Sequence, residues 1–339
     1  MRAVDYTTER TRSIPLTVID GRHGAGKSTV VRHAMRAANG RRVTAVVRGI
    51  DSLVANESDV KHAGSVAIWP NGSMSIETDD PTATLAMLAR REDPPDHVLV
   101  EAEGPANARR ISGYGYMPGY RPDGLITVVD ATTAGASDRD AITDDPFIAS
   151  LRMADVVVLN KADLAGKETT LATQRLIESF APQARFVWCT GGRIALPLLL
   201  GDAGLRAPED RTVVATWDPD YPGVRDREAH SLVGEHCRCW CILSDQPIPA
   251  GEFRRWVSRL PRFILRAAGS VYIQEEPQHR HELSLIGMRW VLSRGKPWAA
   301  EVPSTRITIV GTDGSRGESA RLIRRAQSQL VAHAPGVTP

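Results

Sequence analysis

A glycine-rich segment near the N-terminus constrains this chain more than any other feature. Residues 21–28 read GRHGAGKS, which fits the phosphate-binding pattern G-x-x-x-x-G-K-[ST] at every fixed position. The apolar run 14–19 predicts a short buried strand before it, and residues 29–38 place apolar side chains on one face of a helix after it. In a strand, glycine loop and helix of this kind, backbone N–H groups and the helix N-terminus hold phosphate groups. The segment therefore predicts a nucleotide-binding site.

The side chains of this segment have distinct expected roles. We expect Lys27 to reach the β- and γ-phosphates and the Ser28 hydroxyl to bind magnesium, which prefers hard oxygen ligands. Both are predicted as catalytic residues. The residues of this segment that are predicted to bind the nucleotide are Gly21, His23, Gly24, Ala25, Gly26, Lys27, Ser28 and Thr29.

A second motif indicates which base is bound. Asn160-Lys161-Ala162-Asp163 follows an apolar run and fits the pattern N-K-x-D of guanine-specific P-loop proteins. The Asp163 carboxylate can accept hydrogen bonds from the ring N–H and the amino group of guanine, and a hydrogen bond to a charged group is worth about 1.5–3 kcal/mol. Adenine presents neither donor in that arrangement. We expect Lys161 to pack along the base and Asn160 to join this motif to the glycine-rich loop, so GTP is the predicted nucleotide.

An acidic segment lies between the two motifs in the chain. Glu101-Ala102-Glu103-Gly104 ends a predicted strand, at the position where P-loop proteins keep an acid near magnesium and the γ-phosphate. Glu101 is therefore the predicted magnesium or water-positioning residue. Gly104 is expected to let the backbone approach the γ-phosphate.

The hydrophobic pattern predicts an α/β fold with a doubly wound, mostly parallel sheet. Residues 65–69 and 73–76 are expected to form a hairpin, and residues 105–124, rich in Gly, Tyr, Pro and Arg, a long loop. The further predicted strands are 42–47, 97–101, 125–129, 155–159 and 185–189.

The length of 339 residues predicts two domains. A strand at 239–243, a helix at 252–260, several strands between 267 and 310 and a closing helix at 318–333 indicate a smaller α+β domain at the C-terminus. The predicted organisation is a polar lead-in at 1–13, a P-loop GTPase domain at 14–205, a linker at 206–230 and the second domain at 231–339.

Composition and charge indicate which partners and which cellular location to expect. A formal net charge of +2, with no nucleic-acid motif beside the basic residues, does not favour a nucleic-acid partner. No stretch approaches the length of a membrane span, and the first residues lack the apolar core of a signal peptide. Four cysteines do not make a disulfide framework, so a cytoplasmic location is expected.

Together these motifs resemble those of the CobW-type GTPases, the branch of the P-loop proteins that includes the nickel chaperones for hydrogenase and urease. The similarity continues into the second half, in residues 243–247, 295–301 and the final strand and helix. It implies a protein that hydrolyses GTP with magnesium and either delivers a transition metal, zinc or cobalt, or matures a client metalloenzyme.

The chain departs from this family at its metal motif. Family members usually carry G-C-x-C-C, whereas the equivalent stretch is Gly72-Ser73-Met74-Ser75-Ile76, and neutral hydroxyls are poor zinc ligands. The N-E-x-G stretch of the family is replaced by VRGID at 47–51, and its E-T-T-G by EAEG at 101–104. We therefore expect the usual cargo site to be absent or weakened, and hydrolysis to be altered.

A replacement metal site is predicted at Cys237, Cys239 and Cys241, with His230 or His236 nearby. The competing interpretation is that these cysteines pack as small apolar residues on one sheet face. Alternate residues of a strand lie about 6.7 Å apart, so three sulfurs cannot converge on one zinc ion unless the strand is irregular.

Two functions from different classes follow. The first is a GTPase, slow without a partner, that acts in metal delivery or metalloenzyme maturation and binds a client metalloprotein. The second is a GTP-dependent regulatory or scaffold protein that has lost metal binding. A small-molecule kinase is a third reading that the N-K-x-D motif disfavours. The sequence leaves a homo-oligomer open and names neither the client nor the metal.

Overall fold

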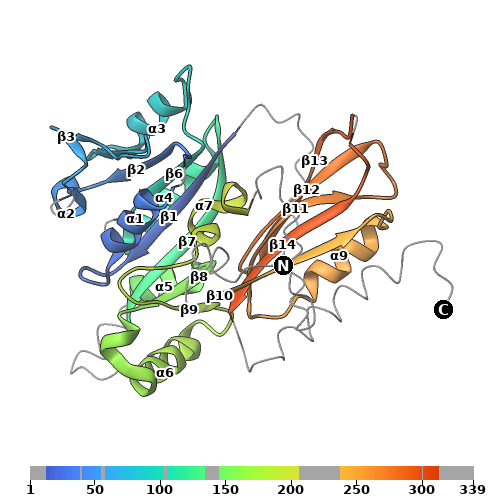
Figure 1. Cartoon of the computed structure of the whole chain (residues 1–339). Coiled ribbons are helices and arrows are strands. Elements are labelled where there is room, and N and C mark those ends of the chain that lie inside the picture. Colours follow the sequence, from blue (N-terminus) through green and yellow to red (C-terminus); the bar gives the residue numbers. More distant parts are fainter. Residues whose placement is uncertain are drawn as a thin grey trace. The chain divides into compact units, whose positions relative to one another are not determined.

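The computed structural model describes residues 13–38, 40–54, 58–102, 105–133, 145–205, 237–299 and 301–312. They form two units that divide between Ala203 and Gly204, and each unit has its own sheet (Figure 1). Within these ranges, every helix is too short or too polar to span a bilayer.

The first unit is built on a nine-stranded sheet. Its strands are β1 Ile14–Gly21, β2 Val43–Val47, β3 Lys61–Ala63, β4 Val66–Ile68, β5 Met74–Glu77, β6 His97–Glu101, β7 Tyr120–Asp130, β8 Val156–Asn160 and β9 Phe186–Trp188. They lie in the order β3-β4-β5-β2-β6-β1-β7-β8-β9, parallel from β5 onward, with β3 and β4 antiparallel to their neighbours. The predicted doubly wound, mostly parallel sheet is confirmed.

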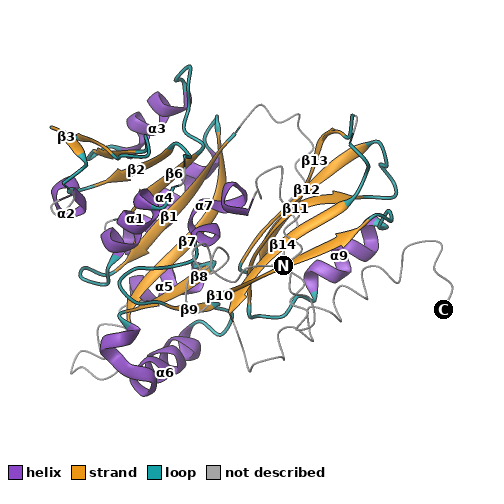
Figure 2. Cartoon of the chain, viewed as in Figure 1, coloured by secondary structure: helices purple, strands orange, loops and turns teal. Residues whose placement is uncertain are grey.

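Helices pack on this sheet (Figure 2). They are α1 Lys27–Arg36, α2 Ile50–Val54, α3 Pro81–Ala89, α4 Pro105–Ser112, the short 3-10 helix η1 Gly113–Tyr116, α5 Asp145–Met153, α6 Ala162–Phe180 and α7 Leu196–Leu205. Side chains of β1, β2 and β6 share one apolar cluster with α3 and α4, and side chains of β7 and β8 share another with α5 and α6. Because helices enclose these strands, β2 and β8 are buried at every residue.

The segment between β4 and β7 contains one confirmed prediction and one error. The predicted hairpin forms between β4 and β5, with Gly72 at φ 81° in its turn. The loop expected at 105–124 is wrong, because this stretch contains α4, η1 and the start of β7. Its Tyr120 hydroxyl donates to the Leu85 carbonyl at 2.7 Å, and a Cβ at Gly115 would lie only 2.7 Å from the Cα of Pro122. Glycine and tyrosine here serve close packing.

The second unit is a five-stranded antiparallel sheet with a helix packed against it, which agrees with the predicted α+β domain. The elements are β10 Cys237–Ser244, α9 Ala250–Ser258, β11 Ile264–Tyr272, β12 His279–Ile286, β13 Arg289–Pro297 and β14 Thr305–Thr312, with strand order β10-β14-β11-β12-β13. Trp240 and Ile242 of β10 share a buried cluster with Phe253 and Trp256 of α9. The predicted linker at 206–230 and the helix at 318–333 lie outside the described residues.

Candidate nucleotide-binding site

The glycine-rich loop connects the end of β1 to the start of α1. Gly21 and Gly26 have φ of 143° and 101°, values that favour glycine. A Cβ at Gly21 would lie 2.2 Å from the Val128 carbonyl oxygen, and one at Gly26 would lie 2.2 Å from Asn160 Nδ2. No side chain fits at either position without moving these neighbours, so the glycines are required by packing as well as by backbone conformation.

The lysine of the motif lies along the loop. Lys27 Nζ donates to the carbonyl oxygens of Gly21 and Arg22 at 2.9 and 3.2 Å. Because α1 begins at Lys27, the N–H groups of its first turn have no partner within the helix and are available to an anion. His23 and Gly24 are exposed in the loop, Ala25 is buried, and Thr29 is half-buried in the first turn of α1.

The two residues predicted to hold magnesium are in contact. Ser28 Oγ donates to Glu101 Oε1 at 2.9 Å, because β6 pairs with β1 and Glu101 lies beside Ile19 at the same edge of the sheet. Burial raises the pKa of Glu101, and the Ser28 hydrogen bond and the charge of Lys27 oppose that rise. A hydroxyl and a carboxylate are hard oxygen ligands, so this pair fits magnesium. Gly104, predicted to approach the γ-phosphate, lies outside the described residues.

The guanine motif begins at the carboxyl end of β8 and touches the phosphate loop. Asn160 Nδ2 donates to the Ala25 carbonyl oxygen at 2.9 Å. Asn160 Oδ1 accepts from the Gly192 N–H at 3.0 Å and from Cys189 Sγ at 3.2 Å. One buried amide therefore joins the phosphate loop, the guanine motif and the segment after β9.

The other two residues of this motif lie at the start of α6. Lys161 has φ of 61°, a left-handed conformation, and its Nζ bonds Asp130 Oδ2 at 2.6 Å. Asp163 is exposed in the first turn of α6. The predicted nucleotide-binding residues of β8 and α6 thus lie next to those of the phosphate loop.

Sequence reasoning missed two acids beside these motifs. Asp20, directly before Gly21, is fully buried, accepts a hydrogen bond from Ser150 of α5 through Oδ2, and has no partner at Oδ1 among the described residues. Burial raises the pKa of Asp20. Burial also acts to raise the pKa of Asp130, but hydrogen bonds from Lys161 and Thr132 outweigh it and the pKa is lowered. The sequence signal that could have identified Asp20 and Asp130 is that each is an acidic residue at the end of an apolar run.

The stretch 72–76, expected at the position of the metal motif, is part of the folded hairpin. Ser73 is buried, donates from Oγ to the Arg41 carbonyl at 2.9 Å and accepts from the Val43 N–H at 3.2 Å. Ser75 is fully buried, and its Oγ accepts from Trp69 Nε1 at 2.9 Å. Both hydroxyls are thus engaged in the hydrogen bonds of the hairpin.

The cysteines predicted as a second metal site lie on β10. This strand pairs with β14 residue by residue from Cys237 to Ser244, without a bulge, so Cys237, Cys239 and Cys241 occupy alternate positions of a regular strand. Cys237 is buried, the side chains of Cys239 and Cys241 are outside the described part, and so are His230 and His236. Among the described side chains, no three His, Cys, Asp or Glu residues lie close enough to hold a metal ion.

Comparison with known proteins matches both halves of the chain. Residues 15–188 match the model of the CobW/HypB/UreG nucleotide-binding domain, and residues 237–327 match the cobalamin synthesis protein cobW C-terminal domain. A zinc chaperone CobW of Pseudomonas aeruginosa is 26% identical, over 92% of this chain and 91% of the relative. A zinc chaperone CobW of a Sinorhizobium species is 27% identical, over 56% of this chain and 62% of the relative, so that match spans less than two thirds of the relative.

The crystal structure of Zn(II)-bound YjiA GTPase from Escherichia coli is 21% identical and aligns with a TM-score of 0.42, over 93% of this chain and 99% of that chain.

Proposed function

We propose that this chain, which belongs to the CobW/HypB/UreG family of nucleotide-binding proteins, is a magnesium-dependent GTPase that acts in metal delivery or metalloenzyme maturation. The observation that best supports the nucleotide assignment is the hydrogen bond from Asn160 Nδ2 to the Ala25 carbonyl, because it joins the guanine motif to the phosphate loop. Asp163 would then accept hydrogen bonds from guanine while the loop amides hold the phosphates.

Hydrolysis needs positive charge where the phosphates carry negative charge. Lys27 would turn from the loop carbonyls to the β- and γ-phosphates, which offer it stronger, charged acceptors. Ser28 and Glu101 would hold magnesium, which when bound supplies positive charge to the phosphate oxygens. We expect slow turnover until a partner completes the site, and we expect the protein to act in the cytoplasm.

Two forms of this function differ in whether the protein binds a transition metal. Relatives named zinc chaperones support zinc as the cargo, with cobalt as the second candidate, and a client metalloprotein as the recipient. The alternative is a GTP-dependent regulatory or scaffold protein without metal. The hydrogen bonds of Ser73 and Ser75 favour this alternative, because both hydroxyls are buried within the hairpin and neither is a zinc ligand of the usual kind.

A competition titration decides between these forms. Zinc or cobalt is titrated against a chromophoric chelator under reducing conditions, with a Mg–GTP analogue, with Mg–GDP and without nucleotide. The wild type is compared with Cys239→Ser, and Cys189→Ser serves as the matched control because Cys189 is a buried cysteine of the first unit and not part of β10.

A metal affinity that depends on the nucleotide and falls only in Cys239→Ser supports a metal carrier whose cargo site is on β10. Equal, weak binding in every condition leaves the metal-free switch. GTP hydrolysis is measured on the same samples, and failure of the wild type to bind GTP more tightly than ATP would contradict both forms.

A further inference from the structure

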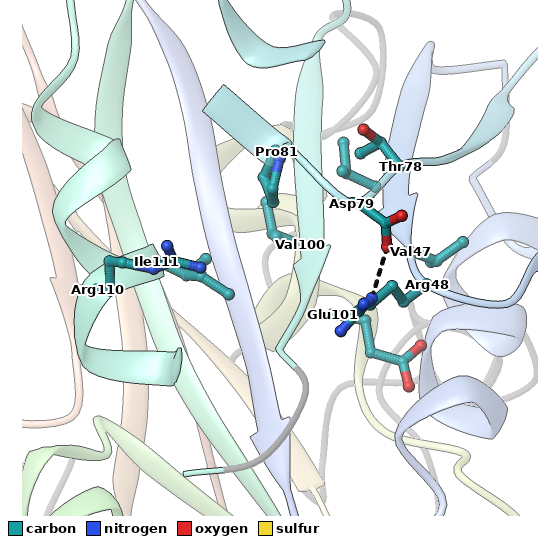
Figure 3. Close-up of a pocket in the computed structure, with 10 residues that line it drawn as sticks. Val47, Arg48, Thr78, Asp79, Pro81, Val100, Glu101, Arg110 and Ile111 are labelled. Atoms are coloured by element: carbon teal, nitrogen blue, oxygen red, sulfur yellow. Dashed lines mark hydrogen bonds and ion pairs between the residues drawn. The ribbon is translucent and has the colours of Figure 1, made fainter. Parts of the chain in front are cut away.

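A pocket opens beside Glu101, at the carboxyl ends of neighbouring strands. It is lined by the ends of β2 and β6, by the connection from β5 to α3, and by α4 (Figure 3). Valine and isoleucine side chains are part of its lining, and its charged side chains are Arg48, Asp79, Glu101 and Arg110. Because Glu101 also accepts the hydrogen bond of Ser28, this pocket adjoins the predicted magnesium site.

The strand order puts Arg48 within reach of the phosphate end of the site. Arg48 directly follows β2, and the order β2-β6-β1 leaves one strand between it and the phosphate loop. Val46 is paired with Val100 and Glu101 with Ile19, so the three strand ends lie at nearly the same level. Neighbouring strands are about 4.8 Å apart, so the backbone at Arg48 is about 10 Å from the end of β1. An extended arginine side chain spans most of that distance.

One contact of Arg48, the ion pair with Asp79, is easily exchanged. Its Nε lies 2.9 Å from Asp79 Oδ1, and the two side chains are 53% and 85% exposed. An ion pair so exposed to water contributes little stability, so a more strongly charged acceptor can displace Asp79. The γ-phosphate is such an acceptor, and the planar guanidinium fork matches its oxygens.

We propose that Arg48 leaves Asp79 and contacts the γ-phosphate of bound GTP, as a catalytic residue of this chain. The inference rests on the proposed GTPase function. In hydrolysis a water oxygen forms a bond to the γ-phosphorus while the bond from that phosphorus to the bridging oxygen of GDP breaks. The proton released by the water passes to phosphate or solvent. Arg48 moves no proton and stabilises the negative charge on the transferring group.

The second cation of the pocket provides the matched control. Arg110 comes from α4, and Figure 3 shows it on the far side of Val100 from Glu101. Arg48→Ala, Arg110→Ala and Asp79→Asn are compared with the wild type, after thermal unfolding has shown that each variant is folded. The readouts are single-turnover hydrolysis of Mg–GTP and the ratio of affinities for a non-hydrolysable Mg–GTP analogue and Mg–GDP.

Arg48→Ala should hydrolyse GTP at least about 1,000-fold more slowly and lose preference for the analogue, with GDP affinity within about twofold of the wild type. Arg48→Lys should recover part of the rate, because it restores the charge without the fork. Arg110→Ala should match the wild type, and Asp79→Asn should match or exceed it.

An Arg48→Ala rate within about twofold of the wild type would overturn the proposal. So would an equal loss in Asp79→Asn, because the ion pair itself would then be what matters. If the wild type hydrolyses no GTP, the proposed function fails, while the affinity ratio still decides the role of Arg48: an unchanged ratio in Arg48→Ala rejects it.

Discussion

Asn160 connects three segments, so its replacement by alanine should weaken both the fold and the nucleotide site. Its side chain is buried and hydrogen-bonds the Ala25 carbonyl, the Gly192 N–H and Cys189 Sγ. A neutral hydrogen bond contributes about 1 kcal/mol, and a buried group left without its partner costs about 1–3 kcal/mol. Asn160→Ala removes the hydrogen-bond partner of the Ala25 carbonyl and of the Gly192 N–H. The free energy of unfolding of the first unit should therefore fall by about 2–4 kcal/mol.

Nucleotide affinity should fall as well, because the phosphate loop loses its bond to the segment that carries Asp163. Urea denaturation gives the stability, titration with fluorescent GDP gives the affinity, and hydrogen exchange locates the loosened amides. Asn71→Ala is the matched control: Asn71 also joins two segments, by Nδ2 to the Met35 carbonyl and by Oδ1 from the Ser73 N–H, but neither bond involves the phosphate loop. It should lower stability and leave GDP affinity unchanged.

The reasoning is refuted if Asn160→Ala unfolds within about 0.5 kcal/mol of the wild type, the range of a neutral surface change, and binds GDP equally well. A loss of stability with no increase in exchange at the phosphate loop would also contradict it, because the bond to Ala25 would then not hold that loop.

Two further changes test the charges of the site. Burial raises the pKa of Asp20, so the folded chain binds this proton more tightly than the unfolded chain and loses stability as pH rises through the raised pKa. Asp20→Asn does not titrate, so its gain in unfolding temperature over the wild type should grow as pH rises above the ordinary pKa of an aspartate, about 4, and a gain that is constant with pH would contradict the argument. Asp163→Asn should weaken GDP binding about 10- to 100-fold and favour XDP, because an amide can donate to the carbonyl that xanthine carries in place of the guanine amino group. Competition between GDP and XDP measures this, and an unchanged preference for GDP would remove Asp163 from the base site.

The parts of the fold that could be predicted are those with strong local signals. The glycine loop is recognisable because only glycine fits at Gly21 and Gly26, and the buried parallel strands are recognisable as continuous apolar runs. The loop predicted from composition at 105–124 was wrong. Glycine and tyrosine residues there allow close packing within α4, η1 and β7. The short edge strand β3 has too few residues to show a pattern.

The site was predictable where one motif carries one role, and less so where contacts come from distant segments. The bonds of Asn160 to Gly192 and Cys189 depend on the pairing of β8 with β9, which local spacing does not reveal. Likewise the pocket around Arg48 exists because β2 lies beside β6, a consequence of strand order. Parallel topology creates such juxtapositions between residues that are far apart in the chain.

The hydrogen bonds of Ser73 and Ser75 also determine what replacement of either serine by cysteine would cost. A thiol is a much weaker hydrogen-bonding group than a hydroxyl, so cysteine at Ser73 would weaken bonds to Arg41 and Val43, and cysteine at Ser75 would weaken the one from Trp69. Placing thiolates at these two positions therefore yields a less stable protein before any benefit from metal can accrue. The buried hydrogen bonds of Ser73 and Ser75 thus oppose the gain of a metal site in this hairpin.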